Sequence, residues 1–393
     1  NIVLQELLGS GTANQGSTGP TGPTNPNATS INITDTNTNA TYYPTFVAGS
    51  GTQSLLADIS TSAISLNPST GDFNVVDTLK LTQTSVALGK TAGVLQAVNN
   101  VAIGALSGGN QANSAISIGY RAGQTSQGLY GIAVGLDAGK NQAQDTIAVG
   151  RSAGNSAQGA ESIAIGFLAG STTQGSQSVA IGRSAGSTTQ GTFATAVGYG
   201  AGATTQGANA VALGVSAGNN TQGAGSVAIG QVAGQTGQLA NSVAVGRSAG
   251  TTNQGTSSVA VGYLAGNNTQ GGSSVAVGNG AGQTSQGTNA VAIGVNAGQG
   301  TTTGQGANAI AIGLNAGVAS QTAGSICLNA SGAALNPNEA GLFVNPIRNV
   351  DVTDVVGYNP TTKEVTYFNE TNLFSVGTPT SYNPILSDSD GNN

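Results

Sequence analysis

The residues of this chain that could do chemistry are few, and most of the paired ones lie near the C-terminus. Asp351 with Asp354, and Glu364 with Glu370, are carboxylate pairs of the kind that act as acid and base in glycoside hydrolysis. Residues 388–392 (Asp-Ser-Asp-Gly-Asn) offer oxygen ligands in the manner of a calcium loop, but the sequence has no distal glutamate after them. We interpret the carboxylate pairs as solvated surface charges and residues 388–392 as a flexible acidic tail. We therefore expect no catalytic residue and no metal site.

The composition excludes several other classes of function. The chain has no histidine and one cysteine, so histidine acid/base catalysis, Cys/His metal sites and a disulfide framework are excluded. The formal net charge is −6, and the nine lysines and arginines are spread along the sequence. Arg151, Arg183 and Arg247 share one place in the repeat described below, but they form only a patchy cationic stripe. We expect no enzyme activity, no cofactor, no nucleic-acid partner and, without a run of about eighteen apolar residues, no membrane insertion.

The dominant feature is an internal repeat of about sixteen residues, typified by Ser178-Val179-Ala180-Ile181-Gly182. Its closing glycine recurs at positions 89, 104, 119, 135, 150, 166, 182, 198, 214, 230, 246, 262, 278, 294 and 313. Residues 299–304 add a three-residue bulge, and a degenerate last repeat contains Cys327. Because one repeat cannot bury its own apolar side chains, stacked repeats must form a common core, as in a β-solenoid.

Each repeat contains a short segment that alternates with the period of a β-strand. The segment Val-Ala-Ile is rich in β-branched residues and places its first and third side chains on one face. We expect this face to fill the interior of the solenoid, with a core that includes Val179, Ile181, Val227, Ile229, Val243 and Val245. The opposite, small-residue face should then contact identical chains, through Ala180, Ala228, Ala244 and Cys327.

A column of glutamines also follows the sixteen-residue period. We predict that the side-chain amides of stacked repeats form a hydrogen-bonded ladder along the fibre axis. The ladder would include Gln174, Gln190, Gln206 and Gln222. An alternative interpretation is that glutamine is only a tolerated turn residue before glycine.

The predicted fold class is all-β: a parallel β-roll with turns of about sixteen residues, in a homotrimer, with small β-rich caps at each end. The expected domains are an N-terminal extension (1–27), a β-rich domain (28–82), the β-roll (83–332), a β-rich C-terminal cap (333–380) and a flexible tail (381–393). Residues 16–24 form three Gly-X-Y triplets, the pattern that a collagen triple helix requires, although a flexible linker has the same composition.

The repeated Ser-Val-Ala-Ile-Gly-x-x-Ala pattern over residues 83–329 resembles the head repeats of trimeric autotransporter adhesins. That resemblance implies left-handed parallel β-rolls, three side by side. It does not extend to a heptad stalk or to membrane-barrel strands. The triplets at residues 16–24 resemble collagen-like segments of viral fibres, and residues 341–348 are similar to segments of fibre proteins from large DNA viruses and phages.

Together these features predict a structural or adhesive trimeric fibre on the surface of a virus particle. Its expected partners are two identical chains, an anchoring protein, and a host glycan or surface receptor. The alternative is a bacterial cell-surface adhesin or filament subunit, which is also extracellular. A glycan-depolymerising tail spike and an ice-binding protein are less favoured. Threonine pairs at 172–173, 188–189 and 204–205 suggest ice binding, but the array is broken at neighbouring repeats.

Overall fold

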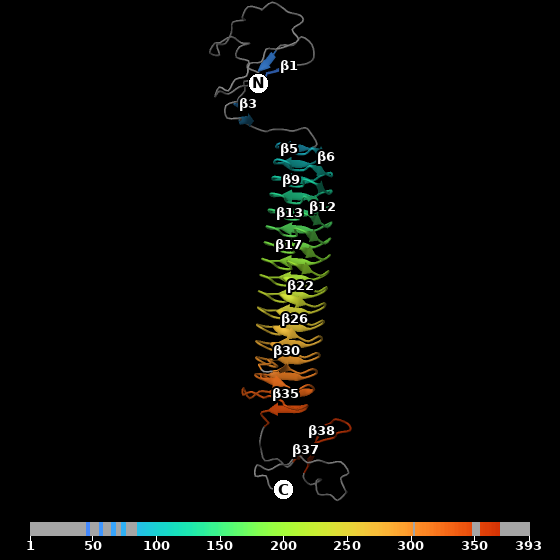
Figure 1. Ribbon diagram of the computed structural model, residues 1–393, viewed down its shortest axis with the longest axis vertical. Coiled ribbons are helices and arrows are strands. Elements are labelled where there is room, and N and C mark those ends of the chain that lie inside the picture. The colour runs from blue at the N-terminus through green and yellow to red at the C-terminus, as the bar shows by residue number, and fades with distance from the viewer. Residues whose placement is uncertain are drawn as a thin grey trace, which may run out of the picture. The chain divides into compact units, whose positions relative to one another are not determined.

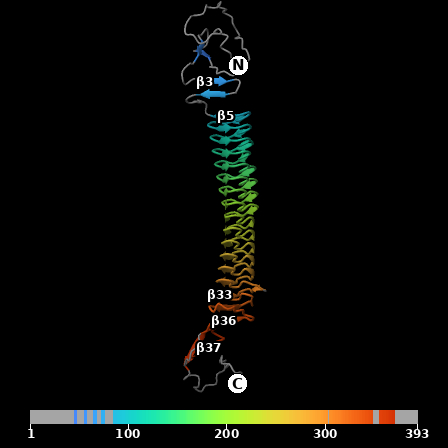
Figure 2. The same cartoon turned by 90° about the vertical axis from the view of Figure 1, so that its left-hand side faces the viewer.

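The computed structural model describes residues 45–47, 55–57, 64–67, 72–75, 85–301, 303–347 and 354–369 of the chain. The chain divides into two compact units, Asn1–Gln83 and Thr84–Asn393, which are described separately. The second unit contains a parallel β-solenoid whose coils are stacked between β5 and β36 (Figure 1; Figure 2). No helix occurs among the described residues.

Each coil contributes one strand to a first parallel sheet, called sheet A here. Its strands pair in perfect register, so that Val179, Ala180 and Ile181 lie beside Thr195, Ala196 and Val197 of the next coil. The strands of sheet A are β5 (Val86–Leu88), β7 (Val101–Ile103), β9 (Ile116–Ile118), β11 (Ile132–Val134), β13 (Ile147–Val149), β15 (Ile163–Ile165), β17 (Val179–Ile181), β19 (Thr195–Val197), β21 (Val211–Leu213), β23 (Val227–Ile229), β25 (Val243–Val245), β27 (Val259–Val261), β29 (Val275–Val277), β31 (Val291–Ile293), β33 (Ile310–Gly313), β35 (Ser325–Asn329) and β36 (Gly341–Asn345).

A second, 15-stranded parallel sheet, called sheet B here, is built from a short strand in each coil that ends at the repeated glutamine. The strands of sheet B are β6 (Leu95–Gln96), β8 (Asn110–Gln111), β10 (Ser126–Gln127), β12 (Asn141–Gln142), β14 (Ala157–Gln158), β16 (Thr173–Gln174), β18 (Thr189–Gln190), β20 (Thr205–Gln206), β22 (Asn220–Gln222), β24 (Thr236–Gln238), β26 (Thr252–Gln254), β28 (Asn268–Gln270), β30 (Thr284–Gln286), β32 (Gly304–Gln305) and β34 (Ser320–Gln321).

In each coil a second glycine follows the closing glycine of the repeat by four residues, as Gly186 follows Gly182. Coils of different length keep both sheets in register because every length change falls between this second glycine and the glutamine. A 16-residue coil has three residues between Gly186 and Gln190, and a 15-residue coil has two between Gly139 and Gln142. The 19-residue coil inserts its three extra residues in the same segment, and Gln286 still pairs with Gln305. The bulge expected at 299–304 therefore falls in the segment between Gly298 and Gln305.

The corner after sheet A requires glycine. Gly182 has a φ of +124°, and a Cβ added there would lie 2.7 Å from the carbonyl oxygen of Gly198 in the next coil. That separation is far below a van der Waals contact. The glycine column thus allows the coils to stack at the spacing of a β-ladder, near 4.8 Å.

The remaining described strands form three hairpin-like pairs. β1 (Thr45–Val47) pairs with β2 (Leu55–Ala57), and β3 (Ile64–Asn67) pairs with β4 (Asp72–Val75), both antiparallel. β37 (Asp354–Tyr358) pairs antiparallel with β38 (Val365–Asn369). The collagen-like triplets at residues 16–24 lie outside the described residues.

Candidate functional site

The interior of the solenoid is lined by alanine, which corrects the expected orientation of the strands. Ala180, Ala228 and Ala244 have no exposed surface in the single chain and belong to one continuous cluster of buried alanines. The prediction that these alanines face neighbouring chains is therefore wrong. The predicted interior residues point outward instead, and each is partly exposed; they are Val179, Ile181, Val227, Ile229, Val243 and Val245.

The reason for this orientation is the small cross-section of a coil. A Cβ added to Gly234 would lie 2.5 Å from the Oε1 of Gln238 and 3.2 Å from the Cβ of Ala228. The space between the two sheets is thus already filled by a methyl group, a glycine backbone and a glutamine side chain. A β-branched side chain at position 228 would have no room, so the Val and Ile side chains take the outer face.

Cys327 occupies the alanine column and shares its environment. The side chain is fully buried in the single chain, and Sγ lies 3.3 Å from the carbonyl oxygen of Leu335 as a hydrogen-bond donor. Loss of hydration on burial raises the pKa of the Cys327 thiol, although a backbone hydrogen bond with Gly317 acts in the opposite direction. The expectation that Cys327 lies at a contact between chains is wrong for the same reason as for the alanines.

The glutamines lie inside the coils and connect the two sheets. The Nε2 of Gln190 donates to the carbonyl oxygen of Val179 at 2.8 Å and to the Oε1 of Gln206 at 3.1 Å, and Gln206 donates in turn to Gln222 at 3.1 Å. The longest continuous run of such bonds joins Gln238, Gln254, Gln270, Gln286, Gln305 and Gln321. Hydrogen bonds of this kind satisfy polar groups that would otherwise be costly to bury.

The glutamine ladder has breaks. The amide of Gln174 donates to the backbone carbonyls of Ile163 and Ser178 and not to Gln190. The buried Oε1 atoms of Gln142, Gln174, Gln190 and Gln238 consequently have no hydrogen-bond partner among the described residues. Of the four glutamines predicted to form the ladder, Gln190, Gln206 and Gln222 are joined by amide hydrogen bonds and Gln174 is not.

The outer face of sheet A carries a continuous apolar surface, called the Val/Ile stripe here. It consists of the first and third residues of the three-residue strands, which are almost all Val, Ile or Leu from β5 to β31 and continue into β33, β35 and β36. Ile181 is 37% exposed and Leu213 is 44% exposed. The stripe follows the whole length of the coil stack, because every coil repeats the same alternation in register.

A second surface feature lies at the corner that follows sheet A, in the residue after the corner glycine. In successive coils this residue is Arg151, Phe167, Arg183 and Tyr199, and the same order of Arg and Tyr returns at 247 and 263. The Cζ of Arg151 lies 4.1 Å from the ring centroid of Phe167, and that of Arg183 lies 5.6 Å from Phe167 and 5.5 Å from Tyr199. We call these six residues the Arg–aromatic column.

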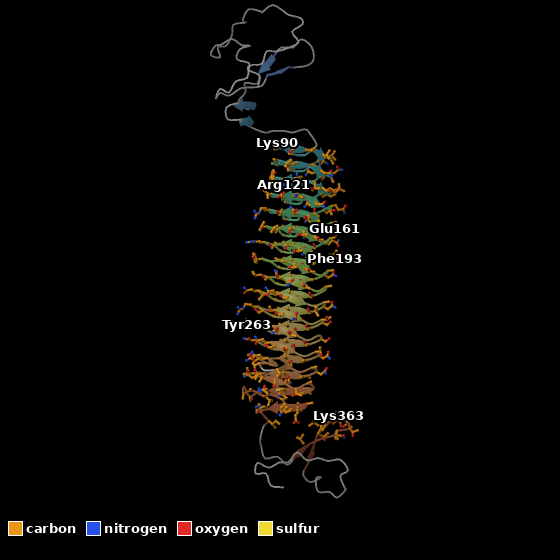
Figure 3. The ribbon with its side chains drawn as sticks, in the orientation of Figure 1. Lys90, Arg121, Glu161, Phe193, Tyr263 and Lys363 are labelled. Atoms are coloured by element: carbon orange, nitrogen blue, oxygen red, sulfur yellow. The ribbon has the colours of Figure 1, made fainter. Side chains whose placement is uncertain are left out.

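The column and the carboxylate of Glu161 lie at different edges of the stack (Figure 3). Tyr263 and Arg121 are seen at one edge of the stack, and Glu161 and Phe193 at the opposite edge (Figure 3). Arg121 is next to the column and pairs with Asp137 at 2.8 Å. The arginine positions alone indicate only a patchy cationic stripe, because aromatic residues occupy the same repeat position in the coils between them. Aligning the repeats on the corner glycine shows the alternation.

One member of each predicted acidic pair lies outside the described residues. Asp351, Glu370 and residues 388–392 lie there, whereas Glu364 is described and its side chain is exposed. Within the described part of the chain, no three His, Cys, Asp or Glu side chains are grouped so that they could hold a metal ion. In the same part of the chain, no helix has the length and apolar character needed to cross a membrane.

Comparison of the chain with protein-family models, with curated proteins and with solved structures finds no match.

Proposed function

We propose that this chain is a subunit of a homotrimeric structural or adhesive surface fibre. The Val/Ile stripe is the observation that supports the proposal best. With one coil per 4.8 Å and two side chains per strand, it is about 75 Å long and about 7 Å wide. Its area, on the order of 500 Å², is at the upper end of the apolar patches that soluble monomers expose. Contact with identical chains in parallel register would remove the stripe from water along its whole length.

Two features of the sequence favour three chains in the fibre. The Gly-X-Y triplets at residues 16–24 match the requirement of a triple helix for glycine at every third position. The repeats resemble those of trimeric adhesin heads, and this resemblance favours three chains as well. The buried alanines cannot contribute to a contact between chains, since they are inside each chain.

In the proposed fibre the stacked coils act as a rigid rod, and the strands before and after them in the sequence serve as β-rich caps. We assign the fibre to the outside of a virus particle, where an anchoring protein would hold it and a host glycan or receptor would be its target. A bacterial cell-surface adhesin or filament subunit is the second candidate, favoured by the resemblance of the Ser-Val-Ala-Ile-Gly repeats. The proposed function is binding and support, without catalysis.

The assembly can be tested by placing charges on the stripe. Glutamate at both Ile181 and Leu213 puts two carboxylates per chain into the proposed contact, where burying an unpaired charge is costly. We expect the wild-type chain to sediment as a trimer and the double variant to dissociate. Its circular dichroism should remain that of the folded coils, because both side chains lie outside the coil interior.

The matched control is glutamate at Thr189 and Thr205, which are exposed on the outer face of sheet B in the same part of the stack. This variant carries the same two added charges and should remain a trimer. A wild-type chain that sediments as a folded monomer, or a stripe variant that stays trimeric, would overturn the proposal. Gold-labelled antibodies against the chain, viewed on intact particles or cells, would distinguish a viral fibre from a bacterial adhesin.

A further inference from the structure

The Arg–aromatic column has a period of two coils. Arginines occur at 151, 183 and 247, which are multiples of 32 residues apart, and aromatic residues occur at 167, 199 and 263, which are also multiples of 32 apart. Val215 and Gln231 interrupt the pattern once in each series. Each arginine therefore lies one coil from an aromatic ring, and Arg183 lies between two of them.

The arginines of the column have no acidic partner within the part of the chain that the structure describes. Between Glu161 and Glu339 the sequence contains no Asp or Glu, and Arg183 and Arg247 are the only charged residues. The ion pairs among the described residues involve Arg121 and Lys140, both with Asp137. In a trimer with the chains in register, neighbouring chains would present the same acid-free coils. The coil stack therefore offers no carboxylate to pair with Arg183 or Arg247, and both guanidinium groups are free to bind an external anion.

Stacking prepares the guanidinium groups for an external anion. The aromatic ring occupies one face of the Arg151 guanidinium, at 4.1 Å, and Arg247 stacks on Tyr263 at 4.4 Å. Such stacking orders the long side chain before any ligand binds, which lowers the entropic cost of binding. The N–H edge remains available for two parallel hydrogen bonds to a carboxylate or sulfate, since the guanidinium groups of Arg151, Arg183 and Arg247 make no hydrogen bond to a described residue.

The spacing of the column selects the kind of anion. Two coils place Arg151 and Arg183 about 10 Å apart, and four coils place Arg183 and Arg247 about 19 Å apart along the stack. A linear polysaccharide with one acidic group per disaccharide repeats its charge at a similar interval. Tyr199 and Tyr263 are 52% and 41% exposed, so their rings can contact the apolar C–H surfaces of sugar rings near the charges.

We propose that the Arg–aromatic column is a binding site for a linear acidic polysaccharide that runs along the coil stack. The carboxylates or sulfates pair with Arg151, Arg183 and Arg247, and the sugar rings contact the exposed faces and edges of the tyrosines. The proposal deepens the adhesive role proposed above and rests on it for its biological context. The site itself is contained within one chain. A single-stranded nucleic acid fits less well, because it carries a phosphate on every nucleotide and most of these would have no arginine.

The test uses the full chain and immobilised polysaccharides of known chemistry. Hyaluronan carries one carboxylate per disaccharide, heparin is densely sulfated, and dextran is neutral. We expect binding to hyaluronan or heparin, weakened by salt, and none to dextran. Replacing Arg151, Arg183 and Arg247 together by Gln should reduce the affinity by about tenfold or more, since charge-assisted bidentate bonds are lost. Lysine at the same three positions should restore only part of the affinity, because lysine lacks the planar guanidinium that forms two parallel hydrogen bonds.

The matched control is Arg121→Gln, which removes a neighbouring arginine that already pairs with Asp137. It should leave the affinity within about twofold of wild type, a difference of less than about 0.5 kcal/mol. Sedimentation of every variant in the same buffer separates a failure of this site from a failure of trimer assembly. The proposal is wrong if neither acidic polysaccharide binds, if dextran or single-stranded DNA binds as well as they do, or if Arg121→Gln weakens binding as much as the triple variant.

Discussion

The side-chain amide of Gln190 donates a hydrogen bond to the amide oxygen of Gln206, one coil further along, at 3.1 Å inside the solenoid. Gln206 repeats this contact with Gln222, and each amide also reaches the backbone of sheet A. The coils are thus joined by the backbone ladders of both sheets and by a third, side-chain ladder between them. The glutamine column belongs to the core and replaces the large apolar residues that usually fill one.

The first prediction concerns this ladder. Gln206→Leu should destabilise the coils around it by about 1–3 kcal/mol, because the buried Oε1 of Gln222 loses its donor and the Nε2 of Gln190 loses one of its acceptors. Hydrogen exchange of the backbone amides in β18, β20 and β22 would measure the effect locally. The control is Gln231→Leu, the same replacement at an exposed position, which should change exchange little. Equal exchange in the two variants would contradict a structural role for the buried amide.

The second prediction tests which face of the strand is inside. Ala228→Val should destabilise the stack by about 1–3 kcal/mol, because the added methyl groups have no space beside Gly234 and Gln238. Ala224→Val makes the same change at an exposed position and should be nearly neutral. Thermal unfolding followed by circular dichroism gives the comparison. If Ala228→Val were tolerated as well as Ala224→Val, the coil interior would be wider than the structure has it.

A third prediction addresses coil stacking. Gly214→Ala should be strongly destabilising, since Gly214 has a φ of +128° and an added Cβ would lie 2.8 Å from the carbonyl oxygen of Gly230. The strained backbone alone costs on the order of 1–3 kcal/mol. Gly272 provides the control, because its φ is not in the positive range and the nearest atom to an added Cβ is at 3.4 Å. Urea unfolding of the two alanine variants should therefore differ clearly, and similar midpoints would be evidence against the close contact between corners.

The fourth prediction uses Cys327. Since its thiol is buried inside the coil, mild oxidation of the native protein should give no covalent dimer on denaturing electrophoresis. A thiol-alkylating reagent should label Cys327 slowly in the native protein and quickly after unfolding. Cysteine introduced at the exposed Thr189, in a chain with Cys327→Ala, is the control and should be labelled at once. Rapid labelling of native Cys327 would place the alanine column at the surface.

The buried thiol of Cys327 should also make the stability of the folded chain depend on pH. Burial raises the thiol pKa in the folded chain above the 9.0 of an exposed thiol, so the folded state keeps its proton at a pH where the unfolded state loses it. The stability contributed by Cys327 is full below pH 9 and is lost as the pH rises through the folded-state pKa. Unfolding of the wild type and of Cys327→Ala, measured between pH 7 and pH 10.5, isolates this effect from other titrating groups. If the unfolding free energy of the wild type did not fall relative to that of Cys327→Ala as the pH rises, the result would contradict a buried thiol.

The sequence by itself determined the repeat length, the position of the strands and the stacking of coils. The corner glycine at 182 and the glutamine at 190 recur with the period of one coil, and the structure places each in a column. The alternation of Val179, Ala180 and Ile181 also determined that the outer two share a face. Local backbone geometry is sufficient for these conclusions, because strands alternate their side chains whatever surrounds them.

Only the tertiary structure decided which face of the strand is inside. The alternation of side chains shows which residues share a face of the strand, but not which face is inside. The greater hydrophobicity of Val179 and Ile181 favoured these residues for the interior. The opposite arrangement forms because Gln190 and the glycine backbone at 186 already occupy the narrow space between the sheets, which leaves room for Ala180 alone. The same stacking brings Arg183 between Phe167 and Tyr199, residues sixteen positions away on either side. Contacts of this range depend on the closure of each coil, which no short segment of the sequence contains.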